Sequence, residues 1–137
     1  MTSLANKSTA RRRILVVDDH ADSAEGLAFL LRLHGHHTCT AEDGLAALEL
    51  ARTFNPEVIV LDIGLPGMNG YEVAQRLRDE HSNLLLVALT GHGKEEDRRR
   101  AMEVGFDHLL VKPILVETLE ALLAATRALH QTESNVP

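Results

Sequence analysis

The stretch Val58-Ile59-Val60-Leu61-Asp62 constrains the fold more than any other part of the chain. It begins with four consecutive apolar residues, three of them β-branched, and such a run predicts a strand buried on both faces, as in the middle of a parallel sheet. The turn-forming sequence Gly64-Leu65-Pro66-Gly67 follows, so the strand is expected to end at Asp62. Ligands bind at the carboxyl ends of strands in open α/β sheets, and Asp62 is therefore a candidate functional residue.

Similar apolar runs alternate with helical patterns along the rest of the chain. Strands are expected near residues 14–17, 36–41, 84–89 and 109–111. Three helices are expected to begin at Asp22, at Asp43-Gly44 and at Asn69. A fourth should span residues 95–104, and a fifth, after the last strand, should run to about His130. The first helix should bury Ala24, Leu27, Leu30 and Leu31. Five strand–helix units in strict alternation predict an α/β fold, with a parallel sheet covered by helices on both faces.

Length and composition exclude several classes of protein. The 137 residues suit one domain, which we place at residues 11–130 between flexible polar tails at residues 1–10 and 131–137. The net charge of −6 argues against nucleic-acid binding through a basic surface. The single cysteine, Cys39, suits a reducing compartment. Because the sequence shows neither a signal peptide nor an apolar run of roughly 20 residues, we expect a cytoplasmic protein with no membrane partner.

Polar residues stand at the carboxyl ends of four expected strands. They are Asp18 and Asp19 after the first strand, Asp62 after the third, Thr90 after the fourth and Lys112 after the fifth. Because parallel strands end at the same edge of a sheet, these side chains are expected to meet at one site. Each residue taken singly is explained by a helix cap or a solvated strand end, but that explanation is weak for four strands together.

The residue types at this edge predict magnesium-dependent phosphoryl transfer. Three carboxylates close together raise one another's pKa values, and a divalent cation removes that repulsion. Carboxylates, a carbonyl group and waters are the ligands that octahedral Mg²⁺ prefers. Asp62 beside such a cation is expected to act as a nucleophile that accepts a phosphoryl group. The hydroxyl of Thr90 and the ammonium group of Lys112 suit the phosphoryl oxygens.

Together with the turn at Pro66-Gly67-Met68-Asn69-Gly70 and the pair Lys112-Pro113, these residues carry a resemblance to a known family. Over residues 12–130 the chain resembles the receiver domain of a two-component response regulator. The resemblance implies a flavodoxin-like, doubly wound (βα)5 fold with the strand order 2-1-3-4-5 and a cis peptide bond before Pro113. The run Gly105-Phe106-Asp107-His108 looks most like receivers attached to hybrid histidine kinases.

The resemblance also implies a role for each site residue. Asp62 would be phosphorylated by a histidine kinase or a histidine phosphotransfer protein, Lys112 would pair with the phosphoryl group, and Thr90 would shift to bond it. The implied Mg²⁺ ligands are Asp19 and Asp62 directly, Asp18 through water, and the backbone carbonyl of Gly64. Such a protein is not an enzyme beyond self-catalysed phosphoryl transfer and autodephosphorylation.

Three positions bear on how the phosphorylated state is read and how long it lasts. Leu109 stands where many receivers carry a Tyr or Phe that turns inward when the threonine moves, so the usual readout is in doubt. Gly64 and His92 flank the expected path of the attacking water. We hypothesise that Gly64 leaves the site open and that His92 contacts the phosphoryl group or orients water, although a solvated loop histidine is an equally simple interpretation.

Several functions remain open. The first is a single-domain receiver that signals through a partner protein, docked through the helix at residues 95–104, the fifth strand and the last helix. The alternatives within this class are a phosphate sink and a relay intermediate. A Mg²⁺-dependent aspartyl phosphatase of the haloacid dehalogenase-like kind is disfavoured, because it needs a second Asp where Gly64 stands. An unphosphorylated scaffold is disfavoured by the intact set of site residues.

Two further stretches contain functional residue types. The sequence His34-Gly35-His36-His37-Thr38-Cys39 has donors for a transition metal, but no matching second cluster, so no metal is expected there. The sequence Asp97-Arg98-Arg99-Arg100 is expected to form a solvated helix face, with docking as an alternative.

Overall fold

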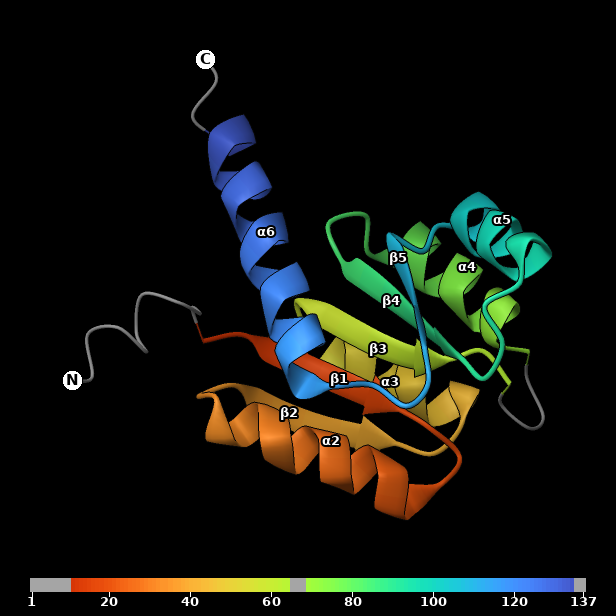
Figure 1. Cartoon of the computed structure of the whole chain (residues 1–137), viewed down its shortest axis with the longest axis horizontal. Coiled ribbons are helices and arrows are strands. Elements are labelled where there is room, and N and C mark those ends of the chain that lie inside the picture. Colours follow the sequence, from red (N-terminus) through yellow and green to blue (C-terminus); the bar gives the residue numbers. More distant parts are fainter. Residues whose placement is uncertain (1–10, 65–68, 135–137) are drawn as a thin grey trace.

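The structure is a computed structural model that describes residues 11–64 and 69–134. Strands and helices alternate throughout the described part of the chain (Figure 1). The elements are β1 (Arg13–Val17), α2 (Ala21–Leu33), β2 (His37–Ala41), α3 (Gly44–Thr53), β3 (Val58–Asp62), α4 (Gly70–Glu80), β4 (Leu85–Thr90), α5 (Glu95–Val104), β5 (His108–Val111) and α6 (Val116–Ser134). The expected alternation is confirmed.

The five strands form one parallel sheet in the order β2-β1-β3-β4-β5. This is the expected order of a flavodoxin-like, doubly wound sheet. Two apolar clusters lie on opposite faces of the sheet. One cluster unites the sheet with α3, α4 and α5, and the other unites it with α2 and α6.

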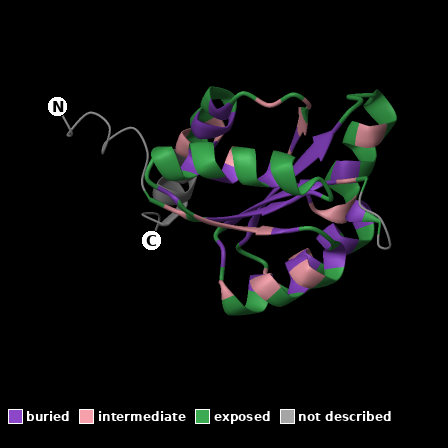
Figure 2. Cartoon of the chain, turned by 90° about the horizontal axis from the view of Figure 1, so that it is seen from below, coloured by how far each residue is buried: buried purple, intermediate pink, exposed green. Residues whose placement is uncertain are grey.

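The burial of the strands follows their place in the sheet (Figure 2). All five residues of β3 are buried, as its run of apolar residues predicts for a central strand. Strand β2 lies at one edge, as expected from its weakly apolar sequence, and only Ala41 of its residues is buried. Strand β5 forms the other edge, and Val111 there is 44% exposed.

The helices begin and end largely where the sequence predicts. The side chain of Asp43 accepts a hydrogen bond from the backbone N–H of Ala46 at the start of α3, and Asn69 accepts one from Tyr71 at the start of α4. Gly105 closes α5 with a φ of 110°, a left-handed conformation that glycine adopts without strain.

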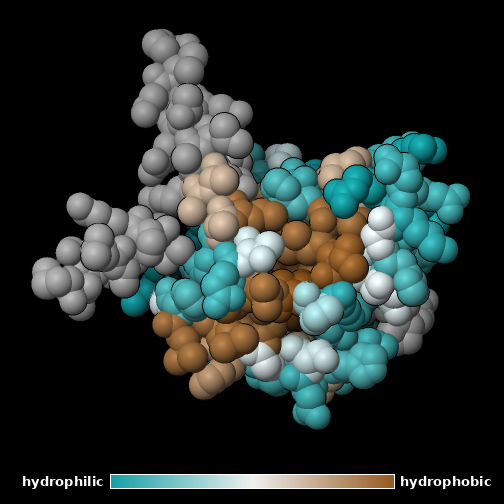
Figure 3. Space-filling model, in the orientation of Figure 1, coloured by the Kyte–Doolittle hydropathy of each residue, from teal (hydrophilic) through white to brown (hydrophobic). Residues whose placement is uncertain are grey.

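Helix α2 corrects two expectations. Its N-cap is His20 rather than Asp22, which lies in the first turn, where its negative charge suits the helix dipole. Its inner face includes Ala28, whereas Leu30 is 41% exposed. The leucine-rich sequence offers more apolar residues than one helix face can bury. Phe29, Leu30 and Leu33 therefore remain exposed, and Figure 3 shows apolar surface at this end of α2.

Helix α6 continues to Ser134, beyond the expected end near His130, so the expected tail at residues 131–137 is wrong for its first part. The tail at residues 1–10 and residues 135–137 lie outside the described part of the chain. Within the described residues, no helix is both long and apolar enough to cross a membrane.

The His34–Cys39 stretch forms a structural contact between β2 and α6. His36 Nε2 lies 2.9 Å from the Glu120 carboxylate, and the two side chains are 1% and 9% exposed. The backbone N–H of Arg12 donates to the other ring nitrogen, Nδ1, at 3.1 Å. Since Nδ1 accepts a hydrogen bond, Nε2 carries the proton and donates it to Glu120. Both ring nitrogens are therefore occupied by protein partners.

Cys39 gives a direct test of the packing of β2. Burial raises the pKa of its thiol to about 11, so the reactive thiolate is scarce at neutral pH. We expect iodoacetamide at pH 8 to alkylate Cys39 roughly a hundredfold more slowly in the folded protein than in urea, where the thiol regains its ordinary pKa. The measurement is modification rate by intact mass. Equal rates in the two states would contradict the packing of this strand.

Gly70 brings the start of α4 directly against the end of β3. A Cβ atom at this position would lie 2.4 Å from the Cα of Ile63 and 3.0 Å from the carbonyl oxygen of Asp62. Real Cβ atoms do not approach backbone so closely, and this backbone cannot rotate away as a side chain would. The glycine therefore fixes the distance between α4 and the strand that carries Asp62.

We expect Gly70→Ala to lower the free energy of unfolding by about 1–3 kcal/mol, because the added methyl group forces the backbone apart. Gly26→Ala is the matched control, since Gly26 lies within α2 and a Cβ there meets nothing within 4 Å. That substitution should stabilise the protein by about 0.5–1 kcal/mol. Urea unfolding measures both changes, and equal effects of the two substitutions would contradict the close contact.

Candidate functional site

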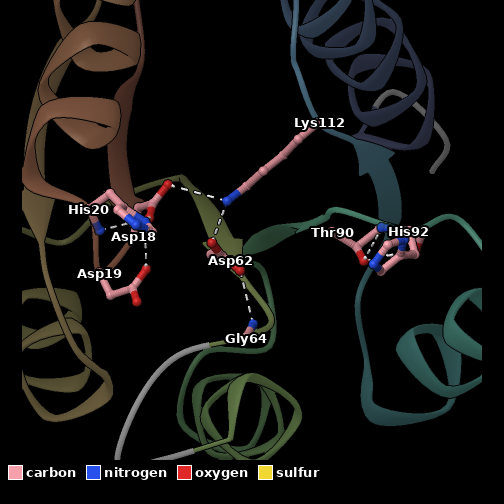
Figure 4. A network of polar contacts seen from close by, with 8 residues as sticks. All are labelled: Asp18, Asp19, His20, Asp62, Gly64, Thr90, His92 and Lys112. Carbon is pink, nitrogen blue, oxygen red and sulfur yellow. Dashed lines mark hydrogen bonds and ion pairs between the residues drawn. The ribbon is translucent and has the colours of Figure 1, made fainter.

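The register of the sheet places the candidate residues at one edge. Val17 of β1 pairs with Leu61 of β3, so Asp18 and Asp62 follow at the same level. Asp62 in turn pairs with Leu89 of β4, and Thr90 pairs with Val111 of β5, which places Lys112 one residue beyond. Figure 4 shows Asp18, Asp62 and Lys112 converging from β1, β3 and β5. The expectation that the strand ends meet at one edge is confirmed.

Lys112 joins the two buried carboxylates. Its Nζ atom lies 2.5 Å from Oδ2 of Asp62 and 3.6 Å from Oδ2 of Asp18. Partial burial disfavours the charged ammonium, but the hydrogen bond to Asp62 and the charges of Asp62 and Asp18 outweigh it, so the pKa of Lys112 is raised. Lys112 is therefore a cation at neutral pH, placed where a group transferred to Asp62 would carry negative charge.

One carboxylate oxygen of Asp62 contacts the loop after β3. Its Oδ1 atom accepts a hydrogen bond from the backbone N–H of Gly64 at 2.9 Å, and the residue is 8% exposed. The two oxygens thus have different partners, an ammonium group and a backbone amide (Figure 4). The turn at residues 65–68, which carries part of the sequence resemblance, lies outside the described residues.

Asp18, Asp19 and His20 form a group of possible metal ligands at the end of β1, the strand next to β3. Donor atoms of these three residues all lie within 4.8 Å of one another. His20 Nδ1 is 3.2 Å from Oδ1 of Asp19, and the His20 backbone N–H donates to Asp18 at 2.9 Å. Asp18 is 3% exposed and lies near the same Lys112 ammonium as Asp62. The sequence reasoning missed His20, although its position directly after the acidic pair could have indicated it.

The donor set fits a hard divalent cation. Asp18 and Asp19 after β1 and Asp62 at the end of β3 supply carboxylate oxygens, the ligands that Mg²⁺ prefers, and the Lys112 ammonium lies near Asp18 and Asp62. The implied ligand at Gly64 is the backbone carbonyl, whereas the described contact of Gly64 is through its N–H. The carboxylates meet the chemical requirement for a metal site at this edge.

Thr90 is at the edge of the site but its hydroxyl is directed elsewhere. The hydroxyl donates to the carbonyl oxygen of His92 at 2.8 Å and accepts from the N–H of His92 at 3.1 Å. Figure 4 shows Thr90 and His92 set apart from Asp62, on the side of α5. The structure therefore ties Thr90 to the loop before α5, a pairing that sequence spacing did not predict.

The bond between Lys112 and Pro113 is cis, as the resemblance implies. Residues 14–124 match the family described as "Response regulator receiver domain". The chain belongs to this family.

Curated relatives carry the same domain within longer proteins. The probable transcriptional regulatory protein TcrX of Mycobacterium tuberculosis is 39% identical over 117 residues, which cover 82% of this chain and 50% of that protein. The DNA-binding response regulator MtrA of Mycobacterium bovis is 40% identical over 117 residues, covering 85% of this chain and 51% of that protein. The receiver chain thus spans about half the length of these relatives.

Solved structures of receivers share the fold. The chemotaxis protein CheY4 of Vibrio cholerae has a TM-score of 0.78 and 30% identity, and the match covers 86% of this chain and 98% of that one. A response regulator protein from Burkholderia pseudomallei has a TM-score of 0.78 and 28% identity, covering 91% of this chain and 75% of that one. The latter crystal structure contains a phosphorylated aspartic acid, a calcium ion and citrate.

Proposed function

We propose that this receiver accepts a phosphoryl group on Asp62 from a histidine kinase or a histidine phosphotransfer protein. The observation that carries the proposal is the buried Asp62 carboxylate at the end of the central strand, with the Lys112 ammonium 2.5 Å from one oxygen. We assign the receiver domain to residues 11–130. The phosphorylated aspartic acid and the calcium ion in the Burkholderia pseudomallei structure support the same chemistry here.

In the proposed reaction, a carboxylate oxygen of Asp62 attacks the phosphorus, and the bond between phosphorus and the donor's imidazole nitrogen breaks. The electron pair of that bond leaves with the imidazole. Lys112 then exchanges its carboxylate partner for the phosphoryl oxygens, whose charge it offsets. Thr90 turns from His92 to bond another of these oxygens. No part of this step requires a residue outside the group at the strand ends.

Mg²⁺ would be held by Asp19 and Asp62, by Asp18 through water, and by the backbone carbonyl of Gly64. When bound there, it supplies positive charge beside the phosphoryl oxygens and relieves the repulsion among the carboxylates. The protein residues contribute the nucleophile, its orientation by the Gly64 N–H, and the Lys112 cation. The chain is thus a signalling domain whose chemistry is limited to its own phosphorylation and dephosphorylation.

The output of the phosphorylated state is proposed to pass through a protein partner at the face formed by α5, β5 and α6. DNA binding is a named property of MtrA, of which the match covers 51%, and the net charge of −6 does not favour it for this chain. A phosphate sink and a relay intermediate use the same site chemistry. Gly64 stands where an aspartyl phosphatase would need its general acid, which disfavours that enzyme class.

Phosphorylation of Asp62 is tested by intact mass after incubation with Mg²⁺ and phosphoramidate. The expected result is a gain of one phosphoryl group by the native chain and none by Asp62→Asn, which removes the nucleophilic oxygen. Omission of Mg²⁺ should strongly reduce the gain. An equal gain in the Asp62→Asn variant would overturn the assignment of the nucleophile.

His92 is expected to influence the lifetime of the phosphorylated state. If its imidazole orients the attacking water, His92→Ala will slow the loss of the phosphoryl group, whereas the backbone contacts of His92 with Thr90 are retained. The decay of the phosphorylated fraction by mass measures the rate. His34→Ala is the comparison, because it removes an exposed imidazole at the end of α2, away from the carboxyl ends of the strands. An unchanged rate in His92→Ala would contradict this role.

A further inference from the structure

Tyr71 lies between the phosphorylation strand and α5. Its ring is covered by the guanidinium of Arg100, whose Cζ atom is 4.2 Å from the ring centroid. Tyr71 is 8% exposed and belongs to the same apolar cluster as Phe106, Leu109 and Ala101. A cation over an aromatic face is attracted by the ring's quadrupole, so this contact depends on how α4 and α5 are placed relative to each other.

The backbone of Tyr71 is fixed to the strand that carries Asp62. Its N–H is capped by Asn69 at 2.7 Å, and the preceding residue, Gly70, packs on Ile63 with no room for a Cβ. The ring end, in contrast, faces α5. Burial and the negative charge of Asp97 raise the pKa of Tyr71, and the positive charge of Arg100 lowers it, so both α5 side chains act on the ring.

Helix α5 is in turn connected to the site through the loop that precedes it. Both polar contacts of the Thr90 hydroxyl are with the backbone of His92, and α5 begins shortly after, with Lys94 as its N-cap. A Thr90 hydroxyl that turns towards Asp62 gives up both contacts with His92. The loop before α5 then loses two hydrogen bonds to the end of β4.

From these contacts we propose that Tyr71 and Arg100 couple phosphorylation of Asp62 to the position of α5. The ring is anchored to the Asp62 strand, and the guanidinium moves with the helix. The inference rests on the proposed function, because it requires a phosphoryl group on Asp62. It assigns the readout to an α4–α5 contact, in a chain whose residue 109 is a buried leucine. The alternative is that the contact only packs two helices and is the same in both states.

The composition makes the test specific. The chain contains one tyrosine and no tryptophan, so its intrinsic fluorescence, apart from the weak fluorescence of phenylalanine, comes from Tyr71. We expect Tyr71 emission to change in proportion to the phosphorylated fraction when phosphoramidate and Mg²⁺ are added. Intact mass, measured on the same samples, gives that fraction independently. Asp62→Asn should show neither the gain in mass nor the change in emission.

Arg100→Gln removes the cation and leaves the ring in place. If the contact belongs to the unphosphorylated arrangement, its loss should raise the rate of phosphorylation about two- to fivefold, the factor that an exposed cation–π contact supplies. It should also abolish most of the change in emission. Arg99→Gln is the matched control, because Arg99 is an exposed neighbour on α5 that carries the same charge, whereas the cation over the Tyr71 ring is Arg100. Arg99→Gln should behave like the native chain.

The outcomes separate the two proposals. A full gain in mass with unchanged Tyr71 emission would overturn the coupling and leave the phosphorylation of Asp62 standing. Equal phosphorylation rates for Arg100→Gln and Arg99→Gln would also overturn the coupling, because the rate would then not depend on the contact between the guanidinium and the ring. Absence of any gain in mass would refute the proposed function and the coupling together.

Discussion

The parallel register of the sheet is the constraint on which the site depends. It sets Asp18 and Asp62 at the same level and brings Lys112 across from β5, although β4 lies between β3 and β5. A slip of one residue in any of these strands would turn the polar side chains to the opposite face. The fully buried β3 resists such a slip, because its four apolar residues would lose the close packing that each makes on its own face of the sheet. The placement of the site residues thus depends on the packing of the core.

Much of this arrangement was predictable because it is periodic. The apolar runs predict buried strands, Asp43 and Asn69 predict helix starts, and the polar strand ends predict a shared site. The edge strand β2 was likewise predictable from its mixed composition. These features depend on local patterns that one sequence displays, together with the general rule that parallel strands share an edge.

The remaining features depend on contacts between distant residues, which no local pattern specifies. The guanidinium of Arg78 donates to the carbonyl oxygens of Ser82, Leu84 and Gly105, and to the carboxylate of Asp107. This one side chain connects α4 with β4 and with the entry to β5, yet in the sequence it resembles any exposed helix arginine. For the same reason the direction of the Thr90 hydroxyl and the exposure of Leu30 could be obtained only from the packed structure.

The buried pair of His36 and Glu120 has a consequence for which parts of the molecule can move. Withdrawing α6 from β1 and β2 would break the hydrogen bond from His36 to the Glu120 carboxylate and leave a buried polar group without its partner, a penalty of about 1–3 kcal/mol. That is a large fraction of the stability of an ordinary domain. We therefore expect the half built from β2, β1, α2 and α6 to move less than the opposite side. On the α4–α5 side, the cation–π contact and the hydrogen bonds between Thr90 and His92 cost less to rearrange, whereas Arg78 and the apolar cluster keep α4 attached to the sheet.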